Sequence, residues 1–186
     1  TGYFNTANGS NALFSNTTGF QNTASGTGSL RSNNTGILNT STGFNSLFGN
    51  TSGNENSAFG NAALANNTGG LSNSAFGSGS LVNNSTGNTN TGMGYVSLFN
   101  NQTGFSNVAV GTHALFNNGN RSNLVAIGDS ALFNNGIGAV NAYEGTLNSA
   151  FGSKALFANT TGYYNTATGS NALRNNSTGV QNTANG

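Results

Sequence analysis

Few side chains in this sequence can take part in acid–base or nucleophilic chemistry. The chain has three acidic residues, four lysine and arginine residues and one histidine in 186 residues. His113 and Asp129 occupy nearly equivalent turn positions in consecutive copies of a repeat, so we expect them to lie near each other. A His–Asp pair can act as a general base and its orienting carboxylate, but no nucleophile or oxyanion donor is identifiable beside it. We therefore interpret both as solvated turn residues and expect no enzyme activity.

Metal, phosphate and nucleic-acid sites have no sequence support either. There is no cysteine, which excludes disulfides and thiolate ligands, and no group of His, Asp and Glu has metal-site spacing. Glycine-rich stretches such as GTGSL lack the lysine of a phosphate-binding loop. Charged residues make up 4% and the net charge is +1, which excludes a basic nucleic-acid surface. No apolar run approaches the ~18 residues of a membrane span. We expect no catalytic, cofactor or metal residues, no nucleic-acid partner and no membrane insertion.

Two polar patterns have both a functional and a structural interpretation. Asn-x-Thr/Ser sequences, the acceptors of N-glycosylation, recur at Asn16, Asn33, Asn50, Asn84, Asn101, Asn159 and Asn176. A turn that needs Asn and Thr for backbone hydrogen bonds explains the same pattern, and we favour it. A Thr/Ser column from Thr6 to Thr183 is typical of solenoids that bind ice, but Val108 and Val125 interrupt it at mid-chain.

A repeat of 17 residues organises the chain. Glycine recurs at this period from Gly9 to Gly128 and again from Gly152 to Gly186. A leucine column (Leu13 to Leu173) follows ten of these glycines by four residues, and an asparagine column (Asn16 to Asn176) follows them by seven. The consensus is NTAxGxxALFxNNTGxx. Seven extra residues within 136–145 form the one interruption, so we expect a single continuous array over 1–186 with a loop insertion near 136–147.

The period predicts the fold class, because a helical-hairpin repeat needs more than ~30 residues. Each repeat has two strand-like pieces, TAxG and ALF, separated by turn residues. We predict an all-β fold, a parallel β-solenoid or β-roll of about eleven 17-residue coils. The repeated glycine suits a positive φ. The asparagine column suits a left-handed turn position and a hydrogen-bonded ladder along the rod. The leucine column and the alanine two residues before each glycine are expected to face the interior.

Outward columns of apolar side chains are the candidate interface. The residue before the repeated glycine alternates away from the inward alanine and is apolar in six central repeats: Phe59, Phe76, Met93, Val110, Ile127 and Phe151. The residue after the leucine is mostly apolar and includes Phe99, Phe116 and Phe133. A third set lies near the ends: Tyr3, Phe4, Tyr163, Tyr164 and Val180. Exposed columns around a thin interior predict that rods pack side by side, and open coil ends predict end-to-end filaments.

Two segments resemble known repeats. NVAVGTHALFNNG at 107–119 and VAIGDSALFNNG at 125–136 resemble the β-roll repeats of trimeric autotransporter adhesin heads and of bacterial surface and tail-fibre-like proteins. The resemblance implies a left-handed coil and a homotrimer whose three-fold axis is lined by the column from Phe59 to Phe151. It also implies an extracellular, cell-surface location and a host surface or glycans as partners. We expect a structural fibre or adhesin-like protein, with an ice-binding or glycan-binding solenoid as the alternative.

Overall fold

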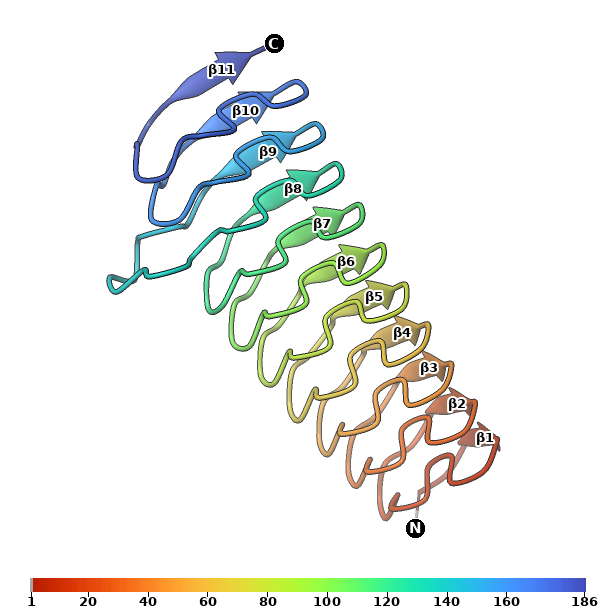
Figure 1. The fold of residues 1–186 in the computed structure, drawn as a ribbon. Coiled ribbons are helices and arrows are strands. Elements are labelled where there is room, and N and C mark those ends of the chain that lie inside the picture. Colours follow the sequence, from red (N-terminus) through yellow and green to blue (C-terminus); the bar gives the residue numbers. More distant parts are fainter. Residues whose placement is uncertain (1) are drawn as a thin grey trace.

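Eleven three-residue strands, one in each repeat, pair in sequence order into a single parallel sheet. The computed structural model describes residues 2–186, and its coils stack into a rod with the two termini at opposite ends (Figure 1). The strands are β1 (Thr6–Asn8), β2 (Thr23–Ser25), β3 (Thr40–Thr42), β4 (Ser57–Phe59), β5 (Ser74–Phe76), β6 (Thr91–Met93), β7 (Val108–Val110), β8 (Val125–Ile127), β9 (Ser149–Phe151), β10 (Thr166–Thr168) and β11 (Thr183–Asn185). The predicted all-β parallel solenoid of about eleven coils is confirmed.

The register of the sheet follows the repeat without a slip. Ala7 pairs with Ala24, and the same residue of every later strand pairs with its counterpart one repeat on. Register is kept even across the insertion, where Ala126 of β8 pairs with Ala150 of β9. The extra residues leave the stack as a loop between β8 and β9 (Figure 1).

The prediction of a second strand in each repeat is wrong. The ALF segment forms turns, because its leucine has a left-handed backbone, with φ of 48° at Leu47 and 54° at Leu81. Strand residues need a φ near −120°. The segment still bonds to the next coil, since the Leu13 N–H donates to the Ser29 carbonyl oxygen at 3.1 Å. The leucines nonetheless point inward as predicted.

The left-handed positions differ in part from those predicted. The repeated glycine does have a positive φ, for example 138° at Gly60, and a Cβ there would lie 2.7 Å from the carbonyl of Gly77. The asparagine column does not, because none of its residues has a positive φ. Leucine takes that role instead, together with the residue two positions before it, such as His113, and the residue two positions before the strand, such as Glu55.

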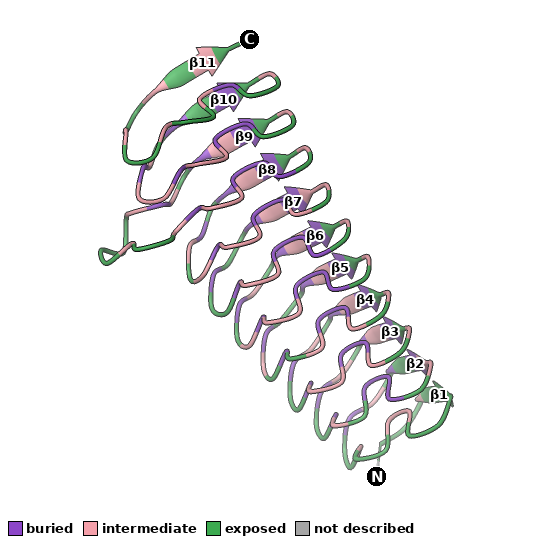
Figure 2. Ribbon diagram, in the orientation of Figure 1, coloured by how far each residue is buried: buried purple, intermediate pink, exposed green. Residues whose placement is uncertain are grey.

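The interior holds the predicted apolar columns and more asparagine than expected. Leucine and alanine side chains such as Leu98 and Ala109 are fully buried, and buried residues line the inner side of the coils (Figure 2). Two asparagines per coil are buried beside them, for example Asn39 and Asn50. The interior is therefore thicker and more polar than one leucine and one or two alanines.

Both buried asparagines form ladders along the rod. In the column that includes Asn50, each Nδ2 donates to the Oδ1 of the preceding coil, at 2.8 Å from Asn50 to Asn33. This predicted ladder is confirmed. The asparagine that begins NTA forms a second ladder, because the backbone N–H and Nδ2 of Asn39 donate to Asn22 Oδ1 at 3.0 and 3.1 Å. Asn39 and Asn50 also donate to the same carbonyl, that of Gly53, at 2.8 and 3.0 Å.

These bonds satisfy the buried polar side chains. No buried side-chain nitrogen or oxygen lacks a hydrogen-bond partner in residues 2–186. A buried amide costs free energy mainly when it is unpaired, so the ladders can join the coils without a desolvation penalty. The solenoid is thus stabilised by side-chain ladders as well as by the sheet.

Candidate interaction surfaces

One outward column makes a continuous apolar line on the sheet. We call it the sheet-face stripe: Phe59, Phe76, Met93, Val110, Ile127 and Phe151, the last residues of β4 to β9. All are 36–45% exposed except Val110, which is half-buried. The rings of Phe59 and Phe76 stack with centroids 5.0 Å apart. Val108 and Val125, at the first strand position, widen the stripe on β7 and β8.

The side chains that follow the leucine column form a stack of aromatic rings rather than an open surface. We call it the phenylalanine stack: Phe99, Phe116, Phe133 and Phe157. Successive ring centroids are 5.2, 5.1 and 5.3 Å apart, and the four side chains are half-buried. Much of their apolar surface is covered by one another, so this column offers less to a partner than the sheet-face stripe.

The apolar and aromatic residues near the ends lie outside the strands and outside the stripe. Tyr3, Phe4 and Tyr164 are more than half exposed, Val180 is 39% exposed and Tyr163 is half-buried. They form local contacts, since Tyr3 stacks on the ring of Phe20 at 4.8 Å and Tyr163 contacts the rings of Tyr143 and Tyr164. The structure therefore divides the predicted interface residues into a central stripe, a ring stack and two end groups.

The charged residues do not assemble into a reactive site. His113 packs against the rings of Tyr95 and Phe116, at 5.8 and 5.6 Å, and Asp129 is exposed. Glu55 accepts a hydrogen bond from Ser72 Oγ on the surface. Nowhere in residues 2–186 do three or more His, Cys, Asp or Glu side chains gather closely enough to hold a metal ion. The same residues contain no helix that is long and apolar enough to cross a bilayer.

The candidate glycosylation sites lie in a buried ladder. Asn33 is fully buried and its Nδ2, the atom that would carry a glycan, donates to Asn16 Oδ1 and to the Gly36 carbonyl. A glycan at this atom would displace both bonds. The structural interpretation of this asparagine column is the one that fits the folded coil.

The insertion forms an ordered loop around one arginine. Arg121 stands where other coils have a glycine, and its guanidinium donates to the carbonyl oxygens of Ala139 and Asn141, both at 2.8 Å. The Glu144 carboxylate accepts from the N–H groups of Val140 and Asn141, at 2.7 and 3.0 Å, and from Asn141 Nδ2. The bonds from Asn141 and Val140, and to a smaller extent the charge of Arg121, lower the pKa of Glu144.

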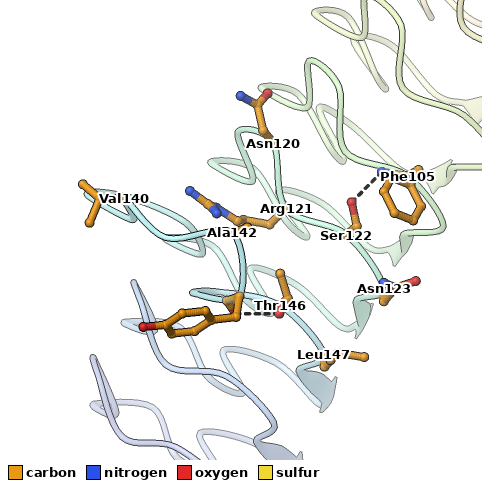
Figure 3. A pocket seen from close by; sticks show the side chains of 10 residues that line it. Phe105, Asn120, Arg121, Ser122, Asn123, Val140, Ala142, Thr146 and Leu147 are labelled. Atoms are coloured by element: carbon orange, nitrogen blue, oxygen red, sulfur yellow. Dashed lines mark hydrogen bonds between the residues drawn. The ribbon is translucent and has the colours of Figure 1, made fainter.

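A hollow of about 710 Å³ lies between this loop and the preceding coil (Figure 3). We call it the insert pocket, and its lining is Phe105, Asn120, Arg121, Ser122, Asn123, Val140, Ala142, Tyr143, Thr146 and Leu147. The sequence predicts the loop but does not predict the pocket. The available signal was the departure from the repeat at Arg121, at Leu124 (which replaces a ladder asparagine) and at the insertion, all within one short region.

Comparison of the chain with protein-family models, with curated proteins and with solved structures finds no significant match.

Proposed function

We propose that the protein is an extracellular structural rod, a subunit of a fibre or adhesin-like surface appendage, that associates with further copies through the sheet-face stripe. The observation that carries the proposal is the row of exposed apolar side chains across β4 to β9, with Val108 and Val125 beside it. Large apolar patches on soluble proteins mark association sites. Burial of side chains such as Phe76 and Met93 between rods stabilises the assembly by removing apolar surface from water.

The regular spacing of the stripe favours a second copy of the chain as its partner. Strands in register place successive stripe residues about 4.8 Å apart, as the stacked rings of Phe59 and Phe76 illustrate. A second rod presents the same residues at the same spacing, so each side chain can fit between two others along the whole stripe. With a net charge of +1, two copies repel each other very little.

A cyclic arrangement around the stripe, such as the homotrimer implied by the adhesin resemblance, buries one stripe per chain in a closed assembly. Each of the strands β1 and β11 has a single sheet neighbour in the described chain. Backbone pairing at these edges extends the rod lengthwise, either through further coils of a longer chain or through another copy. Lateral and lengthwise contacts together make a fibre.

Sedimentation velocity over a concentration series tests the lateral contact. We expect a mass that is a multiple of the 18.6 kDa chain, and a shift to the monomer in the double variant Phe76→Ser/Ile127→Ser. The matched control is Phe44→Ser/Tyr95→Ser, because these two side chains are more exposed than those of the stripe but lie outside it. A monomeric wild type, or equal dissociation of both double variants, would refute association through the stripe. Negative-stain images of the wild type report fibre formation.

A further inference from the structure

The coils separate at one corner, where the insert pocket opens. In the other coils from the second onward, the residue two positions before the strand donates its N–H to the preceding coil, as Asn123 does to the Phe105 carbonyl at 3.1 Å and Tyr164 to the Thr146 carbonyl at 3.3 Å. The corresponding bond from Leu147 to Ser122 is missing from this series. The Leu147 N–H and the Ser122 carbonyl have no other partner within residues 2–186, and both residues line the pocket.

The arginine and the insertion depend on each other. In a regular coil the position of Arg121 is glycine, because a Cβ would meet the carbonyl of the next coil, at 2.5 Å between Gly53 and Gly70. At position 121 an arginine replaces this glycine, in the coil that adjoins the inserted loop. The Arg121 guanidinium then holds the loop by its two carbonyl contacts. The pocket is thus built by matched changes within an otherwise regular repeat.

The lining combines aromatic faces with fixed hydrogen-bonding groups. Phe105 is 49% and Tyr143 is 55% exposed, so each has a ring surface available for contact. Asn120 and Asn123 are exposed amides that can both donate and accept. Figure 3 shows the segment of Asn120 to Asn123 on one side of the hollow and Thr146 and Leu147 on the other.

The charges beside the pocket offset each other. Arg121 already donates to two carbonyls, and the Glu144 carboxylate is occupied by the loop's own N–H groups. One positive and one negative group leave no net charge to select an ionic ligand. The ligand class that fits is a neutral ring with one apolar face and hydroxyls at its edge, since a hydroxyl can accept from the Leu147 N–H and donate to the Ser122 carbonyl.

We propose that the insert pocket binds a neutral saccharide, with a pyranose ring against Phe105 or Tyr143 and its hydroxyls bonded to Leu147, Ser122 and the asparagine amides. The site lies on a different part of the coil from the sheet-face stripe, so binding at the pocket does not depend on association through the stripe. The rod would then present a sugar-binding position at one defined level along its length.

An array of defined oligosaccharides tests the proposal. The probes are neutral oligomers of glucose, galactose, mannose and N-acetylhexosamines, with sialylated and sulfated oligosaccharides for comparison. We expect binding of at least one neutral probe, confirmed by calorimetry and by saturation-transfer NMR with the same compound. No binding, or binding of the acidic probes alone, would overturn the proposal.

Variants locate the site. Of the variants Phe105→Ala and Tyr143→Ala, the one that removes the ring in contact with the sugar is expected to weaken binding of the neutral probe about tenfold, the effect of losing one aromatic contact. Phe20→Ala is the matched control, because Phe20 occupies the same coil position in a regular part of the rod, and its binding should not change. A third variant removes residues 137–143 and carries Arg121→Gly, which restores the repeat; it should keep the β-sheet circular dichroism and lose binding. Unchanged binding in the Phe105 and Tyr143 variants, or in a folded restored repeat, would refute the assignment.

Discussion

The buried ladders make a quantitative prediction at Asn84. This side chain is fully buried. Its Nδ2 donates to Asn67 Oδ1 at 2.8 Å and to the Gly87 carbonyl at 2.9 Å, and its Oδ1 accepts from Asn101 Nδ2 at 2.8 Å. In Asn84→Ala, Asn67 Oδ1 loses its partner and Asn101 Nδ2 keeps only its bond to Gly104. Two buried groups left short of a partner, at about 1–3 kcal/mol each, predict a loss of about 2–6 kcal/mol in the free energy of unfolding.

The adjacent Asn83 is the matched control. It belongs to a half-buried row in which its Nδ2 donates to Asn100 Oδ1 at 3.1 Å, and water can replace that bond. Asn83→Ala should therefore cost less than about 1 kcal/mol.

Urea denaturation followed by circular dichroism compares the two variants. Because each coil contacts only its neighbours, hydrogen exchange should show the loss of protection centred on the coils of Asn67, Asn84 and Asn101. Equal destabilisation by Asn83→Ala and Asn84→Ala would show that the ladder is not a main source of stability, and the reasoning would fail.

Two further predictions concern the glycine at the coil position of Arg121 and the insertion loop. Gly53→Ala should destabilise the rod, because its Cβ would lie 2.5 Å from the Gly70 carbonyl oxygen. Gly69→Ala is the control, because its Cβ would have no neighbour closer than 3.5 Å, and its urea midpoint should be close to that of the wild type. Equal urea midpoints for the two variants would contradict the close-approach argument. The pKa of Glu144 is lower in the folded loop than in the unfolded chain. The ionised carboxylate therefore stabilises the ordered loop fully at a pH above the pKa of the unfolded chain. This stabilisation is lost as the pH falls through the pKa of the folded loop. Hydrogen exchange at Val140 and Asn141 should therefore speed up in acid and in Glu144→Gln at neutral pH, with the coils unaffected, and protection that does not change with pH would rule out this role.

The repeat alone was enough to predict the coil, its period and the leucine and alanine columns of its interior. Leucine and alanine recur at fixed positions, and a chain that returns to the same place every 17 residues buries the same columns each time. The backbone of the leucine was not predictable in this way. A left-handed conformation costs an ordinary side chain about 1 kcal/mol or more, so local preference argues for a strand at ALF. Packing of the leucine in the interior outweighs that preference, and packing is a property of the stack rather than of the segment.

The second ladder and the insert pocket were missed for a related reason. The asparagine that begins NTA looks like a turn residue until its neighbour one coil away is known, because its partner is another asparagine in the stack. Arg121 looks like a tolerated surface change until the glycine position is seen to face the next coil at close range. Both features depend on contacts between coils, which a single repeat does not contain.

The unbroken register has a consequence for how such a rod can change in length. Each strand pairs only with the strands before and after it, and both asparagine ladders continue from any regular coil to the next. Duplicating or deleting one regular unit would lengthen or shorten the molecule by about 4.8 Å and give every remaining coil a neighbour of the same kind. Recombination between repeats in the encoding DNA can thus adjust the distance between the insert pocket and either end in fixed steps, without a new interface having to evolve.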